Sequence, residues 1–259
     1  MTPITRRAAM AALAPALLPG FARAADPLPA MVRLDALYIP ALSLTSAAQT
    51  DAKAAPRAVQ ALERLRQAWP ALRAALAATP PTAAAGADWN RALAAVARQI
   101  AQAEAAVAKA AWHDAHEALE PVRIELMKVR RSAGYDYFVD RLTAFHEPME
   151  VLALAGSQLQ PQGLDAPKRG ELERAFAEAS ARWREVETHL PDPRRHGLSA
   201  AREAQFRQGV AAETQALARL SDALRGTDAA ALLAAARAIK PPFARAFTAF
   251  GLAEGETLG

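Results

Sequence analysis

Residues 89–107 read WNRALAAVARQIAQAEAAV, and residues 112–129 read WHDAHEALEPVRIELMKV. In both stretches the apolar side chains that could form a core recur three or four positions apart. This spacing places them on one face of an α-helix, as the seam of a helical bundle requires. The two seams are Trp89, Leu93, Val96, Ile100, Ala103 and Val107, and Trp112, Ala115, Leu119, Val122, Leu126 and Val129.

The composition of the whole chain favours the same class of structure. Of its 259 residues 52% are apolar, alanine dominates, and only 12 are glycine, a mixture with high helix propensity and low strand propensity. We therefore predict an all-α fold of about eight helices. The expected ranges are 31–48, 54–78, 88–108, 111–131, 138–155, 169–190, 200–225 and 228–248. No Gly or Pro marks the turn near Lys109, so one fused helix over 88–131 is an alternative there.

The second half of the chain repeats features of the first half at three offsets. The matches are Arg33, Leu34, Ala36 and Pro40 with Arg141, Leu142, Ala144 and Pro148 (offset 108), Ala61 and Trp69 with Ala175 and Trp183 (offset 114), and Trp89, Leu93, Ile100, Val107, Val122 and Leu126 with Phe206, Val210, Leu217, Leu224, Ile239 and Phe243 (offset 117). The offset changes only between helices, because an insertion inside a helix would rotate later side chains off the core. The repeat predicts two tandem four-helix up-down bundles, modules 26–133 and 134–259; chance similarity between alanine-rich helices is the alternative.

Residues 1–25 have the features of a cleavable signal peptide. They hold no acidic residue, place Arg6 and Arg7 before an apolar stretch, and end in Ala22-Arg23-Ala24. The paired arginines and the mild alanine-rich stretch are typical of a twin-arginine signal. A membrane-spanning helix is the competing interpretation, but the apolar stretch is short and interrupted by proline. We expect cleavage near Ala24 or Ala25 and a periplasmic mature protein.

Charge and cysteine content exclude several classes of function. Cleavage would remove three of the 31 basic residues, leaving 28 against 27 acidic residues, so the mature chain is nearly neutral. No basic run with interleaved aromatic residues remains, which argues against nucleic-acid binding, and no further long apolar stretch predicts a membrane span. The chain has no cysteine, and this excludes disulfides, thiolate metal sites, iron–sulfur clusters and covalently attached haem.

Short motifs resemble the periplasmic cytochrome b/c-prime family of four-helix bundles. Ala61-Leu62-Glu63-Arg64-Leu65-Arg66, running on to Thr79-Pro80-Pro81, is similar to the second helix of that family, and Phe206-Arg207-Gln208-Gly209 with Gly226 and Lys240 is similar to its third and fourth helices. The resemblance implies that each module is a whole bundle of this type. The family binds haem through a Met on helix one and a His near the end of helix four. The corresponding residues here are Ile39 and Arg130 in the first module and Glu147 and Phe247 in the second, so b-type haem is not expected.

Histidine and glutamate gather on two helices that are adjacent in the sequence. His116 and Glu120 are four residues apart on the helix expected over 111–131, and His146 and Glu150 are four apart on the next helix. An antiparallel packing of these helices would bring both pairs to one level at the junction of the modules. Imidazole and carboxylate groups on facing helices can bind Zn, Fe, Mn or Cu(II). We predict a divalent metal site there, for which His113 and Met149 are possible additional ligands.

Two other functions compete with a metal-binding protein. The same residues can form ordinary ion pairs at the junction, Glu120 with Arg123 and His146 with Glu150, in a ligand-free scaffold that binds another periplasmic protein. A haem-binding electron-transfer protein is the third interpretation. No catalytic motif points to an enzyme.

Overall fold

The computed structural model describes residues 26–253 and 255–256, and within these ranges it contains helices and no strand. This confirms the predicted all-α class. Residues 1–25, on which the predicted signal peptide falls, lie outside the described residues. The α-helices of the described part are α1 (Leu28–Ala48), α2 (Ala55–Ala78), α3 (Gly86–Val107), α4 (Trp112–Ser132), α5 (Val139–Gln158), α6 (Ala166–Thr188), α7 (Ala200–Arg225), α8 (Ala229–Arg237) and α9 (Lys240–Thr248).

Helix starts are fixed by capping side chains that the sequence provides. Asp165, Ser199 and Asp228 each precede a helix in extended conformation, and their side-chain oxygens accept hydrogen bonds from backbone N–H groups of the first turn. Such caps satisfy donors that have no partner within the helix. They account for the sharp starts of α6, α7 and α8.

Two turns decide where helices end: one chooses between the alternatives left open near Lys109, and the other differs from our prediction. Residues 108–111 form a turn in which Ala110 has a φ of 52°, so α3 and α4 are separate helices. The single helix expected over 228–248 is instead broken at Ala238 and Ile239. Pro241 and Pro242 have no N–H to donate back to the preceding turn, which explains why the helix stops and restarts there.

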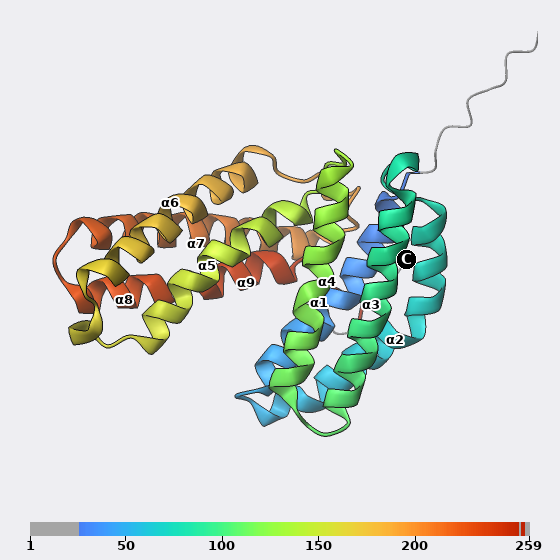
Figure 1. The fold of residues 1–259 in the computed structure, drawn as a ribbon, viewed down its shortest axis with the longest axis horizontal. Helices are drawn as coiled ribbons and strands as arrows, with labels where there is room; N and C mark the ends of the chain where they lie inside the picture. Colours follow the sequence, from blue (N-terminus) through green and yellow to red (C-terminus); the bar gives the residue numbers. More distant parts are fainter. Residues whose placement is uncertain (1–25, 254, 257–259) are drawn as a thin grey trace, which may run out of the picture.

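The helices form two groups (Figure 1). In the first helical group α1 packs on α2 and α4, and α3 packs on α2 and α4; in the second, α5 and α7 pack on α6, α8 and α9. The helices of the second group run across those of the first, and contacts of α4 with α5 and of α1 with α9 join the two. The module limits 26–133 and 134–259 remain predictions.

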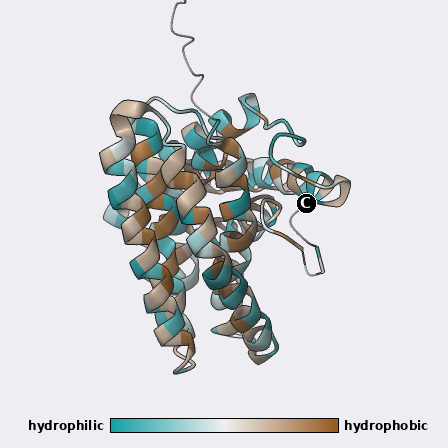
Figure 2. Ribbon diagram, turned by 90° about the vertical axis from the view of Figure 1, so that its right-hand side faces the viewer, coloured by the Kyte–Doolittle hydropathy of each residue, from teal (hydrophilic) through white to brown (hydrophobic). Residues whose placement is uncertain are grey.

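One apolar core extends through both groups. Its largest fully buried side chains include Trp89 of α3 and Trp183 of α6, and the cluster continues through the junction by way of Phe138, Val139 and Leu142. On the helices that face the viewer in Figure 2, hydrophobic and hydrophilic residues lie side by side, as expected when one face of a helix is buried. No helix among the described residues combines the length and apolar character that crossing a bilayer needs.

Candidate functional site

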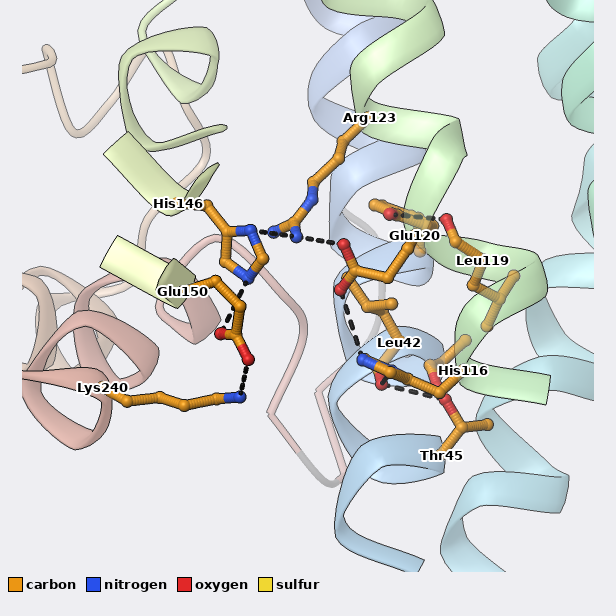
Figure 3. Close-up of polar contacts among 11 residues, drawn as sticks. Leu42, Thr45, His116, Leu119, Glu120, Arg123, His146, Glu150 and Lys240 are labelled. Carbon is orange, nitrogen blue, oxygen red and sulfur yellow. Dashed lines mark hydrogen bonds and ion pairs between the residues drawn. The ribbon is translucent and has the colours of Figure 1, made fainter. Parts of the chain in front are cut away.

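The four predicted ligand residues lie together where α4 meets α5 (Figure 3). His116 and Glu120 lie one turn apart on α4, and His146 and Glu150 lie one turn apart on α5. Their side chains are partly buried, with exposed fractions between 18% and 24%. The contacts offered as the alternative to a metal site, Glu120 with Arg123 and His146 with Glu150, are both present.

The α4 pair is tied to the first helical group. The Nδ1 of His116 lies 3.2 Å from the carbonyl oxygen of Leu42 on α1, and its Nε2 lies 3.3 Å from Oε1 of Glu120. The other oxygen of Glu120 accepts a hydrogen bond from the guanidinium of Arg123, one turn further along α4. Glu120 is thus held between an imidazole and a guanidinium group.

Arg123 carries the contacts across the junction. Its side chain is 5% exposed, its Nη2 lies 2.9 Å from Nδ1 of His146 on α5, and its Cζ lies 5.4 Å from the ring centre of Phe247 on α9. A guanidinium group that is planar and always charged suits such a partly dehydrated position better than an ammonium group. Figure 3 shows Arg123 reaching from α4 to the ring of His146.

The α5 pair ends the chain of contacts on the second helical group. The Nε2 of His146 lies 3.7 Å from Oε2 of Glu150, and Oε1 of Glu150 accepts a hydrogen bond of 2.8 Å from Nζ of Lys240 at the start of α9. The polar contacts therefore run in one line from Leu42 to Lys240. Along this line each carboxylate is placed beside a basic side chain of the protein.

The surroundings of His146 keep its imidazole neutral. Burial, together with the positive charges of Arg123 and Lys240, lowers the pKa of His146 to about 2. Because Nδ1 accepts the hydrogen bond from Arg123, the ring proton belongs on Nε2, facing Glu150. His146 thus contributes a hydrogen-bond acceptor to the junction and no charge.

The described residues contain no group of three or more His, Asp or Glu side chains arranged to hold a metal ion. Arg123 lies between the two His–Glu pairs and separates them. The two additional candidates do not join the pairs: His113 is exposed, one turn before His116, and Met149 is fully buried in the core of the second helical group. The contacts of the two His–Glu pairs and Arg123 thus form a network of ion pairs and hydrogen bonds.

A second polar cluster at the junction was not predicted from the sequence. Arg130 at the end of α4 makes two hydrogen bonds to Asp140 at the start of α5, at 2.9 and 2.5 Å, and both residues are buried. The hydroxyl of Tyr137 donates to Asp35 of α1 at 2.5 Å, and the ring of Tyr137 stacks under Arg130. Burial raises the pKa of Asp35 to about 6.

The only sequence signal for this cluster is that Arg130 occupies a core position of its helix. In the repeat, its counterpart is the buried Phe247 (offset 117), and the counterpart of Asp140 is Val32 (offset 108). Charged residues that replace apolar ones at matched positions in adjacent helices suggest a buried pair. That comparison could have found it.

Comparisons of this chain with protein-family models, with curated protein sequences and with solved structures find no match.

Proposed function

We propose that this protein is a non-catalytic, exported scaffold of helical bundles that binds another protein in the periplasm. The proposal rests on the contacts of the His/Glu network, which consists of His116, Glu120, His146 and Glu150. Positively charged side chains of the protein itself bind the last three of these residues. Arg123 contacts Glu120 and His146, and Lys240 contacts Glu150, so side-chain atoms that could bind a metal ion are already bonded to the protein's own cations. The polar residues at the junction then serve to hold the two helical groups in one relative position.

A rigid scaffold needs an exposed surface for its partner, and α5 offers one beside the junction. Val151 and Leu154 lie about one turn apart on α5 with 48% and 44% of their surfaces exposed. They follow Glu150 directly, so a partner bound there would contact a helix whose position the network fixes. Large apolar side chains on an exposed helix face are a common feature of protein contacts.

The test combines metal analysis with partner capture on protein purified from periplasm. We expect a metal content far below one ion per chain, and capture of a periplasmic protein that Leu154→Ser weakens. Ile124→Ser changes another exposed apolar residue, which is 36% exposed on α4, and is the matched control. One metal ion per chain that disappears in His116→Ala would overturn the scaffold proposal, as would equal capture by all variants.

A metal-binding protein is the second candidate, and the spacing of each His–Glu pair supports it. Two ligand atoms 3.3 Å apart, as are Nε2 of His116 and Oε1 of Glu120, can both reach one Zn ion at about 2.0–2.2 Å. Such binding requires that Arg123 move away, because its charge repels a cation. If this candidate is right, Arg123→Met will bind Zn or Cu(II) more tightly than the unmodified protein; if the scaffold is right, neither will bind stoichiometrically.

A further inference from the structure

A cavity of about 290 Å³ lies between the two helical groups, away from the His/Glu network. Residues of α1 and α2 line it from the first group, and residues of α7, α9 and the segment after α9 line it from the second. The polar side chains among its lining residues are Ser43, Arg57, Gln60, Arg64, Arg202, Gln205 and Thr248. No acidic residue is among the lining residues, and the exposed Arg64 gives the wall a positive charge, so the cavity favours a negatively charged occupant.

The α2 wall presents its hydrogen-bond donors in one row. Arg57, Gln60 and Arg64 are three and four residues apart and therefore share a face of α2. Arg64 is exposed, and among the described residues it has no ion pair or hydrogen bond. Arg66, two residues later on another face, contacts Glu63 and Glu104 instead. Arg64 thus presents to the cavity a guanidinium group that is available to a ligand.

The opposite wall is held rigidly by bonds within the second helical group. Arg202 is buried and contacts the carbonyl oxygens of Gly197 and Gly251 and the carboxylate of Glu256, which balances its charge. Gln205 donates to the carbonyl oxygen of Arg245 and to Thr248. This wall gives the cavity its shape, while α2 supplies the donors.

Apolar surface completes the cavity. Pro40 and Leu44 of α1 and Leu252 after α9 also line it. A cationic row beside an apolar patch fits a ligand that carries an anionic group at one end and hydrocarbon at the other. The volume is at the lower end of the roughly 300–1,000 Å³ found for ligand pockets, so the ligand must be small.

We infer that this cavity binds a small organic acid, with its carboxylate or phosphate oxygens on Arg64 and its neighbour Gln60. Arginine presents two parallel N–H groups that match either oxyanion. The apolar part of the ligand rests on Pro40, Leu44 and Leu252. This site is independent of the scaffold proposal, because it uses neither the His/Glu network nor the exposed face of α5.

Calorimetric titration of the mature chain with benzoate, succinate and inorganic phosphate tests the inference. We expect at least one of these probes to bind, with an affinity that falls about tenfold or more in Arg64→Gln, because a neutral amide replaces the charged group of a charge-assisted hydrogen bond. Gln60→Leu should weaken the same probe. Arg66→Gln, which removes an equal charge from α2 outside the cavity, should leave its affinity unchanged.

The pattern among the probes identifies the anionic group. Binding of benzoate or succinate without phosphate supports a carboxylate ligand, and tighter binding of phosphate supports a phosphorylated one. The inference is overturned if no probe binds at millimolar concentration, or if Arg64→Gln and Arg66→Gln weaken binding equally. Partner capture by Arg64→Gln distinguishes the two proposals, because it should equal that of the unmodified protein whether or not the cavity binds an acid.

Discussion

Glu213 is an acidic side chain enclosed in the second helical group. It is 0% exposed, and neither carboxylate oxygen has a hydrogen-bond partner among the described residues. Burial raises the pKa of Glu213 to about 8, although the positive charge of Arg219 favours the ionised form. In the repeat its counterpart is Val96 (offset 117), which is also fully buried. The acid therefore occupies a position built for an apolar side chain.

This burial makes the stability of the protein depend on pH. Glu213 binds its proton more tightly in the folded chain than in the unfolded chain, where the pKa is close to 4.5. The free energy of unfolding should therefore fall as the pH rises above about 4.5, until the loss is complete above about 8. We predict that Glu213→Gln removes this dependence and is more stable than the unmodified protein at pH 9 by a few kcal/mol, on the order of 4.

The measurement is urea denaturation of both proteins between pH 5 and pH 9, with the difference in unfolding free energy followed against pH. Glu203→Gln, which changes an acid of α7 that is paired with Arg207 on the surface, is the control and should show no such trend above pH 6. A constant difference between Glu213→Gln and the unmodified protein across this range would show that Glu213 is charged when folded.

At the scale of helices, α7 and α9 approach one another through a glycine. A Cβ atom placed on Gly209 would lie 2.5 Å from the backbone nitrogen of Ala246 and 2.8 Å from its Cα, closer than atoms can pack. We predict that Gly209→Ala separates α7 from α9 and lowers the free energy of unfolding by about 1–3 kcal/mol or more, because a packed core resists added volume.

A second glycine provides the comparison. Gly170 in α6 is also helical, but a Cβ atom there would meet only the Arg174 side chain, at 3.7 Å. Gly170→Ala should therefore raise the free energy of unfolding by about 0.5–1 kcal/mol through better helix propensity. Thermal denaturation of the two variants distinguishes packing from propensity: a stabilising Gly209→Ala would mean that the two helices lie further apart than the structure shows.

Most helices were predictable because their apolar residues keep a period of three to four. The expected ranges 54–78 and 200–225 agree with α2 and α7 to within a residue. The break between α8 and α9 was missed because the repeat suggested a continuous helix like α4, whereas Pro241 and Pro242 in this copy remove two hydrogen-bond donors. The two prolines therefore determine where this helix breaks, and the repeat did not predict it.

At the scale of the whole molecule, the sequence identified which polar residues meet and, as one of two alternatives, the pairs Glu120 with Arg123 and His146 with Glu150. His116, Glu120, His146 and Glu150 were placed correctly on the facing helices. Those two pairs each lie within one helix, so residue spacing suggests them. The contact of Arg123 with His146 depends on how α4 crosses α5, and helical periodicity does not determine a crossing between helices. The role of Lys240 was not predictable for the same reason, since it lies 90 residues from Glu150.

The buried pair of Arg130 and Asp140 links the end of one helical group to the start of the other. Arg130→Met leaves a buried carboxylate without its cation, so we predict a loss of about 3–5 kcal/mol in the free energy of unfolding. The double variant Arg130→Met with Asp140→Leu should recover most of that loss, because an apolar pair of similar size needs no partner. Urea denaturation of the single and double variants measures both effects.

A surface ion pair in the same segment shows whether the loss of unfolding free energy in Arg130→Met comes from burial or from charge alone. Arg141 contacts Asp136, which is 75% exposed, so Asp136→Asn should cost about 0–1 kcal/mol. If Arg130→Met costs no more than Asp136→Asn, then water reaches Asp140 in solution and the two helical groups are not fixed to each other at this point. A large loss that the double variant recovers would show that the junction is a continuous part of one core. The orientation of the two helical groups would then be set by apolar packing and not by the buried ion pair itself.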